Sequence, residues 1–427
     1  MMARVALWLY GLVTALAPPL LRRKLQRRGQ QEPGYLAHID ERFGRYTQPP
    51  ETTPALVWIH AVSLGETRTA AILLKALRAA NPGLRLLLTH GTATGRAEGA
   101  ALLNAGDIQV WQPWDSRAAV ERFFTHFKPR LGLLMETEIW PNTVAIAKAR
   151  AIPLVLVNAR LSDKSLQQAL RLWPLSKPAY AALSGAFAQT PDDAARLNLL
   201  GAPVEGVFGN LKFDAAPSPS QQAGGKAWRA ALRRPVIMFA SSREGEEVAF
   251  LEAVKAAAAD VFVLIVPRHP QRFDEVAALC VAQGLRVSRR SAWPSGPADT
   301  DDALHADVWL GDSLGEMALY YAMADVALLG GSFAPLGGQN LIEAAACGCP
   351  VVMGPHTFNF SEAAELAEDA GAALRVTDMA QAVSTAVLLV TDPARHAAAV
   401  AAGLAFAQAN SGATGKTVAA LSARFNN

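Results

Sequence analysis

The stretch GGSFAPLGGQNLIEAAACGCPVVMGPHTFNF, residues 330–360, says most about the fold of this chain. An apolar segment ends just before it, a glycine-rich turn follows, and the pattern then predicts a helix from near Asn340 to Gly348 and a buried strand at 350–353. A strand, a glycine turn and a helix start place backbone N–H groups where they can bind a phosphate. Glu343, one turn into the helix, is placed to reach a ribose hydroxyl. The stretch therefore indicates a nucleotide-sugar site.

A simpler interpretation is that this helix is only well capped. Asn340 and Glu343 have the spacing of a capping box, in which each residue binds backbone N–H groups at the helix start. Capping explains these two residues, but it does not require the surrounding glycines Gly330, Gly331, Gly337 and Gly338.

The rest of the chain alternates short apolar segments with helical patterns, which predicts an α/β protein with buried parallel strands. The predicted strands lie at 55–60, 84–90, 107–111, 131–135 and 153–158, and then at 235–240, 261–266, 325–330 and 350–353.

A stretch rich in Pro, Gly, Ser and Gln separates these two series of strands. We therefore expect two doubly wound, Rossmann-like domains at 34–214 and 227–427, joined by a linker at 215–226. Such domains bind ligands at the carboxyl ends of their strands, in a cleft between the two halves.

The N-terminal segment 1–30 is predicted to be a membrane anchor. An apolar run at 5–21 precedes a basic flank of Arg22, Arg23, Lys24, Arg27 and Arg28. The run is barely long enough to span a bilayer and contains Pro18–Pro19, so a short span and a helix lying in the interface both remain open. A buried N-terminal helix is the third alternative. The basic flank predicts that the following domains stay in the cytoplasm.

Composition excludes several classes of function. The 427 residues are 51% hydrophobic and 18% charged, which is typical of a globular protein with two or three domains. A net charge of +3 is too small to indicate a nucleic-acid partner. Three cysteines provide neither a disulfide framework nor zinc spacing. An Asp-x-Asp at 299–301 lies in a Pro/Gly/Ser/Asp stretch with no strand before it, so a solvated loop is favoured over a metal site.

Candidate site residues in the first half follow predicted strands. HAVSLGET (60–67) carries Glu66, which is interpreted equally well as a general base or as a capping residue. METEIWPN (135–142) carries Glu136 and Glu138, two residues apart, and at most one of these two carboxylates is expected to face a ligand directly. NARLSDKS (158–165) and GNLKFD (209–214) add Arg160 and Lys212 as possible anion contacts.

The second half offers candidate phosphate contacts. ASSREGEE (240–247) brings Ser241, Ser242 and Arg243 to a predicted helix start, and VPRHP (266–270) places Arg268 beyond a buried strand. SLGEM (313–317) provides another helix start led by a glycine.

These motifs, in this order, resemble those of the 3-deoxy-D-manno-octulosonic acid (Kdo) transferases. The matching motifs are HAVSLGE, ETEIWPN, NARLSDKS, GNLKFD, SSREGEE, PRHP, GEM and the stretch from GGQNLIE to HTFNF. The resemblance runs from about Tyr35 to the end of the second predicted sheet. It implies a glycosyltransferase of the GT-B fold that moves Kdo from CMP-Kdo to a lipid A precursor, at the cytoplasmic face of the bacterial inner membrane.

The resemblance also implies roles for individual residues. Glu66 matches the catalytic base, while Glu136, in preference to Glu138, and Lys212 support charge in the transition state. The implied contacts with CMP are Pro267, Arg268, Gly315, Glu316, Met317, Asn340, Leu341, Ile342 and Glu343. Two positions depart from the family pattern, since Gln339 and Arg243 stand where histidines are common. A protonatable group beside the donor is therefore in doubt at both positions.

The expected reaction is a direct displacement that inverts the anomeric carbon and needs neither a metal nor a cofactor. The expected partners are CMP-Kdo, a lipid A precursor and the membrane surface, with no obligate protein partner evident. The rival hypotheses are a GT-B transferase that uses another nucleotide sugar and a membrane-anchored GT-B protein without catalytic activity.

Overall fold

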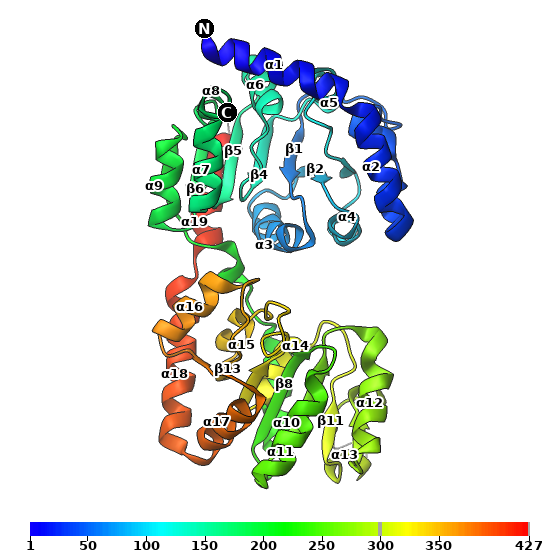
Figure 1. Cartoon of the computed structure of the whole chain (residues 1–427), viewed down its shortest axis with the longest axis vertical. Helices are drawn as coiled ribbons and strands as arrows, with labels where there is room; N and C mark the ends of the chain where they lie inside the picture. The colour runs from blue at the N-terminus through cyan, green and yellow to red at the C-terminus, as the bar shows by residue number, and fades with distance from the viewer. Residues whose placement is uncertain (298–300, 426–427) are drawn as a thin grey trace. The chain divides into compact units, whose positions relative to one another are not determined.

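The protein folds into two compact units, here described from a computed structural model that covers residues 1–297 and 301–425. The first unit comprises Met1–Asp214 together with the C-terminal segment from Ser411 onward, and the second comprises Ala215–Asn410. Each unit is a parallel sheet with helices on both faces (Figure 1). The predicted pair of Rossmann-like domains is therefore confirmed.

The sheet of the first unit has seven described strands in the order β3-β2-β1-β4-β5-β6-β7, all paired in parallel. All five predicted strands are present, and two short ones at its edge were not predicted. The strands are β1 (Leu56–His60), β2 (Arg85–His90), β3 (Ile108–Trp111), β4 (Leu131–Met135), β5 (Leu154–Ala159), β6 (Gly185–Ala188) and β7 (Val204–Val207).

Each face of this sheet is covered by its own apolar core, because the central strands are apolar on both sides. Helices α5 (Arg117–Phe127), α6 (Pro141–Ala149), α7 (Asp163–Arg171), α8 (Trp173–Tyr180) and α9 (Pro191–Leu199) cover one face. Helices α3 (Leu64–Ala80) and α19 (Ala413–Phe425) cover the other, and α4 (Ala93–Ala100) packs beside α3.

The second unit repeats this architecture with the strand order β10-β11-β9-β8-β12-β13-β14 in the residues described. Its strands are β8 (Val236–Ser242), β9 (Phe262–Pro267), β10 (Val287–Arg289), β11 (Val308–Leu310), β12 (Val326–Leu329), β13 (Val351–Met353) and β14 (Ala373–Arg375). Its helices are α10 (Pro219–Ala230), α11 (Glu246–Ala257), α12 (Phe273–Ala282), α13 (Asp301–Leu304), α14 (Met317–Met323), α15 (Ile342–Ala346), α16 (Ser361–Asp369), α17 (Met379–Thr391) and α18 (Pro393–Asn410).

The predicted domain boundaries need two corrections. The segment 215–226 is not simply a linker, because α10 begins at Pro219, where proline favours the first turn of a helix, and packs against α14. The second domain does not extend to residue 427. Helix α19 packs against α3 in the first unit, and the Asp214 carboxylate accepts the backbone N–H groups of Gly412 and Thr414.

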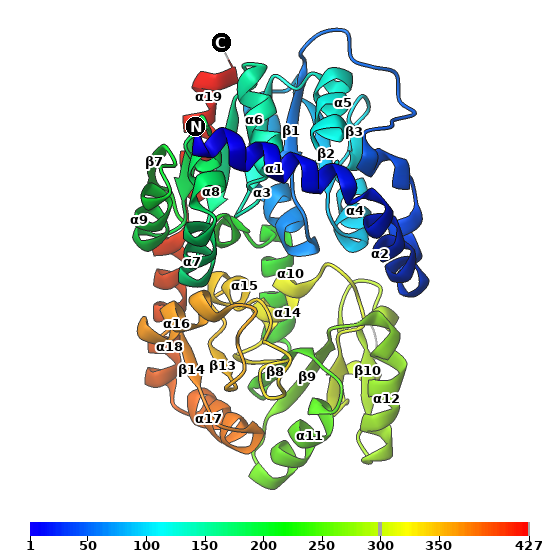
Figure 2. The same cartoon turned by 45° about the horizontal axis from the view of Figure 1, so that its top comes forward.

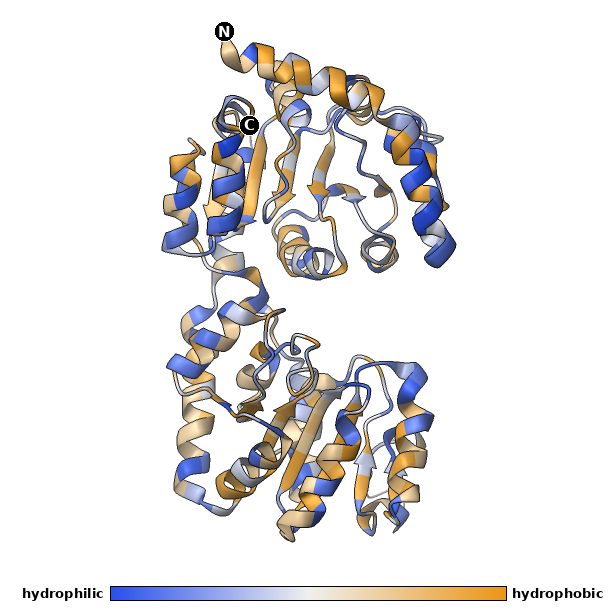
Figure 3. Cartoon of the chain, in the orientation of Figure 1, coloured by the Kyte–Doolittle hydropathy of each residue, from blue (hydrophilic) through white to orange (hydrophobic). Residues whose placement is uncertain are grey.

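The N-terminal segment forms two helices rather than one. Helix α1 (Met2–Leu16) and helix α2 (Pro18–Gln31) meet at Ala17 with a bend of 54°, and Pro18 lacks the N–H that a continuous helix would use. Among the described residues no single helix is long and apolar enough to cross a membrane. The bent pair of α1 and α2, taken together, has the length and the composition of a membrane span. Helix α1 is largely apolar and α2 largely hydrophilic (Figure 3).

Helix α1 packs against α5, α6 and α8 of its own unit (Figure 2). None of its residues is fully buried, which excludes the predicted alternative of a buried N-terminal helix. Its large apolar side chains are instead exposed, namely Val5, Trp8, Leu9, Leu12, Val13 and Leu16.

The C-terminal helix should contribute to the stability of the first unit. Leu421 is fully buried in the core beside α3, so we expect Leu421→Ala to lower the free energy of unfolding by about 2–5 kcal/mol. Leu404→Ala on α18, where the side chain is 46% exposed, is the control and should change it little. Urea unfolding of both variants measures this difference, and equal midpoints would contradict the packing described.

Candidate functional site

The acidic candidate of the first unit lies where β1 meets α3. Ser63 is the N-cap of α3, and its Oγ accepts the backbone N–H of Glu66 at 3.3 Å. In return, the Glu66 carboxylate accepts the Val62 N–H at 2.8 Å and the Ser63 hydroxyl at 3.0 Å. Ser63 and Glu66 therefore cap α3 reciprocally, as the structural interpretation of the motif predicted, except that Glu66 accepts the Val62 N–H in place of the Ser63 N–H of a standard capping box.

The same carboxyl is also electrostatically unusual. Burial raises the pKa of Glu66 above its ordinary value, and the carboxylates of Glu136 and Glu138 raise it further, against the opposing hydrogen bonds from Val62 and Ser63. Burial and like charge both disfavour the ionised form. Capping and an elevated pKa thus coexist in one side chain.

Glu136 is paired with the basic residue predicted to act with it. The Lys212 Nζ lies 3.4 Å from the Glu136 Oε1. Lys212 is held there because the side-chain oxygen of Asn158, at the end of β5, accepts the neighbouring Leu211 N–H at 2.9 Å. The backbone N–H of Arg160 donates to the Glu136 carbonyl at 3.3 Å, while the Arg160 side chain is exposed.

The segment that carries Glu136 and Glu138 is not extended, because Glu136 has a left-handed backbone with φ of 55°. The two carboxylates bind different partners, Lys212 for Glu136 and Trp140 for Glu138. This turn brings both carboxylates close enough to Glu66 to act on its pKa.

Glu138 belongs to a buried network that the sequence did not reveal. Its Oε2 accepts the Trp140 indole N–H at 2.9 Å and lies 3.8 Å from the His60 Nε2. Burial acts to raise the pKa of Glu138, but His60 and Trp140 hold it below its usual value. The other His60 ring nitrogen bonds to the Thr89 hydroxyl at 2.9 Å. A histidine at the end of an otherwise apolar strand was the only sign of this network in the sequence.

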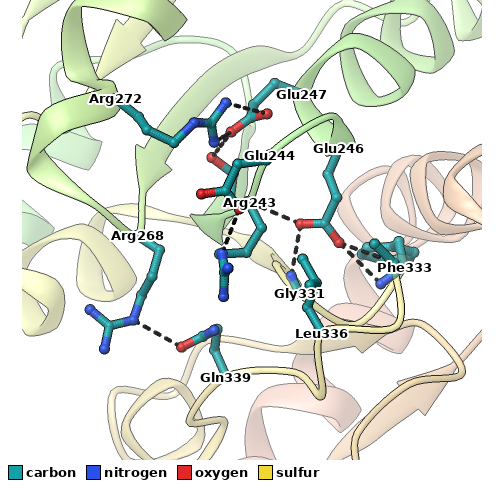
Figure 4. A network of polar contacts seen from close by, with 12 residues as sticks. Arg243, Glu244, Glu246, Glu247, Arg268, Arg272, Gly331, Phe333, Leu336 and Gln339 are labelled. Carbon is teal, nitrogen blue, oxygen red and sulfur yellow. Dashed lines mark hydrogen bonds and ion pairs between the residues drawn. The ribbon is translucent and has the colours of Figure 1, made fainter. Parts of the chain in front are cut away.

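In the second unit the predicted phosphate donors are already occupied. The buried Glu246 carboxylate accepts the backbone N–H groups of Arg243 at 3.0 Å and Gly331 at 2.7 Å. It also accepts those of Phe333 and Ala334, each at 3.2 Å (Figure 4). The start of the glycine-rich turn therefore binds a protein carboxylate rather than presenting these N–H groups to a ligand, which corrects the sequence prediction.

A close approach of backbones explains the glycine that begins this turn. A Cβ at Gly330 would lie 2.2 Å from the Ser241 carbonyl oxygen, so only glycine fits. Ser241 itself has a φ of 54° at the end of β8. Ser242 is fully buried and donates to Glu247 at 2.8 Å, and Glu247 pairs with Arg272 at 2.6 Å. Ser242 therefore has a structural contact in place of the predicted ligand contact.

The remaining candidates of this unit follow β9 and β12. Arg268, next to Pro267, donates from its Nε to the Gln339 side-chain oxygen at 3.1 Å (Figure 4). Gln339 and Arg243 are the two residues that depart from the expected motifs. The Arg243 guanidinium pairs with the Glu244 carboxylate at 2.9 Å.

Unlike Glu66, Glu343 does not cap a helix. Helix α15 begins at Ile342, two residues later than predicted, and ends at Ala346. Asn340 accepts the Ile342 N–H at 3.0 Å, while Glu343 has no hydrogen-bond or ion-pair partner among the residues described. Burial alone raises the pKa of Glu343. The capping-box interpretation is therefore wrong here, although it was right for Glu66. Leu341 and Ile342 are buried beneath this carboxyl.

The GEM motif lies at the start of α14. The Gly315 carbonyl accepts the Gln221 side chain at 2.7 Å, and the Glu316 carboxylate binds Arg290 at 2.9 Å and the Ser313 hydroxyl, just before Met317 begins the helix. Nowhere in residues 1–297 and 301–425 do three His, Cys, Asp or Glu side chains cluster in a way that could hold a metal ion. Asp299 of the Asp-x-Asp lies outside the described residues.

Comparison with known proteins identifies the family. Residues 37–215 match the family model of 3-deoxy-D-manno-octulosonic-acid transferase (kdotransferase). A 3-deoxy-D-manno-octulosonic acid transferase of Bordetella pertussis is 48% identical over 96% of this chain and 98% of its own length. The chain belongs to the Kdo transferase family. One from Haemophilus influenzae is 31% identical over 88% of this chain and 89% of its own.

Similarity to solved structures supports the fold of this Kdo transferase. The structure of Anabaena Alr3699/HepE in complex with UDP matches 86% of this chain and 100% of its own, with a TM-score of 0.55 at 15% identity. At that identity the match shows the two-domain GT-B type of fold and nothing of the substrate. The family model covers the unit that carries Glu66, Glu136 and Lys212.

Removal of the Glu246 carboxylate should destabilise the glycine-rich turn. Each buried donor left without a partner costs about 1–3 kcal/mol, so we expect Glu246→Ala to lower the free energy of unfolding by about 3 kcal/mol or more. Glu252→Ala is the matched control, because Glu252 is exposed on the same helix. Urea unfolding tests both variants, and a stable Glu246→Ala protein would show that the carboxylate is dispensable.

Proposed function

We propose that this Kdo transferase moves Kdo from CMP-Kdo to a lipid A precursor, with Glu66 as the general base. The observation that carries the proposal is the carboxyl of Glu66, whose pKa is raised at the end of a parallel strand, with the Glu136–Lys212 pair nearby. A base whose pKa is shifted toward neutrality is suited to take a proton from a sugar hydroxyl.

Glu66 can act without leaving its cap. An ionised carboxylate has about four lone-pair positions, and the hydrogen bonds from Val62 and Ser63 use two of them. A free position accepts the proton of the acceptor hydroxyl while that oxygen forms a bond to the anomeric carbon of Kdo. The bond from that carbon to the phosphate oxygen of CMP breaks in the same step, and attack from the opposite side inverts the configuration.

The Glu136–Lys212 pair supplies a second element of the mechanism. Kdo carries a carboxylate, and Lys212 is a cation held beside Glu136, which itself acts on Glu66. We infer that Lys212, positioned by Glu136, balances the negative charge of the reacting sugar. Glu138 supports the arrangement through Trp140 and His60.

The second unit would hold CMP. The unpartnered carboxylate of Glu343 suits the ribose, because the ribose has two adjacent hydroxyls that can each donate a hydrogen bond to a carboxylate oxygen. Arg268 suits the phosphate, and the Pro267, Gly315–Met317 and Asn340–Ile342 backbones frame the same end of the sheet. Because Glu246 occupies the N–H groups at the start of the turn, cationic side chains carry more of the phosphate binding than the sequence indicated.

The N-terminal helices would bring the enzyme to its acylated acceptor. The exposed apolar face of α1 adjoins the basic residues of α2, and this combination suits the interface of a membrane with anionic lipids. We propose attachment at the cytoplasmic face of the inner membrane.

The role of Glu66 is tested by Glu66→Gln, which keeps the size, and whose carbonyl oxygen can still accept the Val62 N–H. We expect turnover of CMP-Kdo with a lipid A precursor to fall by roughly 10²–10⁴-fold. In the unsubstituted enzyme the rate should fall as the pH drops through the raised pKa of Glu66, above the range of an ordinary glutamate, and the variant should lose this limb. Glu98→Gln, at an exposed ion pair with Arg68, is the control. Near-normal turnover of Glu66→Gln would refute the assignment.

The donor site is tested by Glu343→Ala. We expect titration calorimetry to show CMP binding at least tenfold weaker, because the ribose loses a charge-assisted hydrogen bond, while the unfolding midpoint changes little. Glu365→Ala, at an exposed position on α16, serves as the comparison and should bind CMP normally. Unaltered affinity in Glu343→Ala would exclude Glu343 from the nucleotide site.

A further inference from the structure

Helix α1 directs two polar side chains toward the rest of its unit. The half-buried positions that face the unit recur at helical spacing and include the polar residues Tyr10 and Thr14. The exposed positions carry the larger apolar side chains, among them Trp8 and Leu12. Tyr10 and Thr14 thus lie among the small or apolar half-buried residues Ala3, Ala6, Leu7 and Gly11, and membrane attachment alone does not require these two polar side chains.

The partner of this face is a buried carboxylate. Asp115 lies between β3 and α5 and is 5% exposed. It accepts the N–H groups of Asn142 at 2.9 Å and Thr143 at 2.8 Å, and the Thr143 hydroxyl at 2.6 Å. Helix α6 has no side-chain cap of its own, since its N-cap residue is Trp140. Asp115 thus caps α6 from another part of the chain.

Helix α1 completes this cap. The Tyr10 hydroxyl and the Asp115 carboxylate act on each other's pKa, and the Asn142 Nδ2 donates to the Thr14 hydroxyl at 3.5 Å. The same Asn142 amide donates to the Asp115 carbonyl at 2.5 Å. Thr14 of α1 therefore contacts the first turn of α6, and Tyr10 faces the carboxylate that caps this turn.

The capped turn is directly connected to the proposed catalytic carboxylates. Residues 136–140 run from the end of β4 to the start of α6 and carry Glu136 and Glu138. With β4 fixed in the sheet, the position of the first turn of α6 decides how this short segment lies. A contact that holds this turn therefore also holds the two carboxylates that act on Glu66.

We propose that Tyr10 and Asp115 are positioning residues, through which the N-terminal helix orders the segment 136–140. This inference rests on the proposed function for its kinetic consequence, but its structural part stands without it. Helix α1 then has two roles, one on each face. Its outer face binds the membrane, and its inner face fixes the carboxylates.

The test is Tyr10→Phe, which removes only the hydroxyl. Tyr46→Phe is the matched control, because the Tyr46 hydroxyl is buried in the same unit and has no hydrogen-bond partner in the described residues. With a lipid A precursor dispersed in detergent, we expect kcat of Tyr10→Phe to fall about two- to tenfold, the range expected for one hydrogen bond. Its KM for CMP-Kdo and its binding to anionic phospholipid vesicles should match the unsubstituted enzyme. Tyr46→Phe should retain full kcat.

Hydrogen exchange separates this inference from the proposed function. In Tyr10→Phe the amides of Asn142 and Thr143 should exchange faster, with no change at β1, whether or not the enzyme transfers Kdo. If the unsubstituted protein transfers no Kdo, the proposed function fails while the exchange result still decides the inference. Unchanged exchange at 142–143, an unchanged kcat, or an equal loss of kcat in Tyr46→Phe would overturn it. If Asp115→Asn folds, it should show the same changes more strongly.

Discussion

The structure depends on how buried carboxylates satisfy backbone N–H groups at the ends of parallel strands. Wherever a strand ends and a helix or turn begins, several N–H groups lack a partner within the element. Glu66 serves α3, Asp115 serves α6 and Glu246 serves the glycine turn. Each lies at the edge of a sheet where ligands of such folds bind. The same constraint that closes the fold therefore also collects negative charge at the proposed sites.

The need to pair these N–H groups explains why the spacing of a capping box led to a side-chain cap at one helix and not at another. Ser63 and Glu66 have the spacing of a capping box and cap α3 reciprocally, whereas Asn340 and Glu343 have an equivalent spacing and do not cap α15 in this way. The difference lies in where each helix begins, since α15 starts two residues after Asn340 and leaves Glu343 within its first turn. Sequence spacing fixes which residues are near one another, but the local backbone decides which of them bond.

Much of the architecture followed from the sequence because buried parallel strands are apolar on both sides. The nine expected strands are present, and the boundary after Asp214 was visible as a change in composition. The short edge strands such as β7 and β14 were missed because they alternate or carry few apolar residues.

At the sites, motif order identified Glu66, Glu136 and Lys212. It did not identify His60, Asp115 or Glu246. Their partners Thr89, Thr143 and Gly331 are 28 or more residues away and come together only through the sheet. The left-handed backbone of Glu136 had no sequence signal either, since such a conformation is unusual outside glycine, asparagine and aspartate.

The return of the chain to its first unit has a consequence for biosynthesis. The polypeptide leaves this unit after Asp214 and comes back at Ser411, and Leu421 and Phe425 complete the core beside α3. A ribosome makes this segment after the whole of the second unit, so the second unit has its sequence available while the first still lacks α19. The unit whose synthesis begins first is thus completed after the second, and the nascent enzyme exposes the incomplete core of its Glu66 unit until α19 has been made.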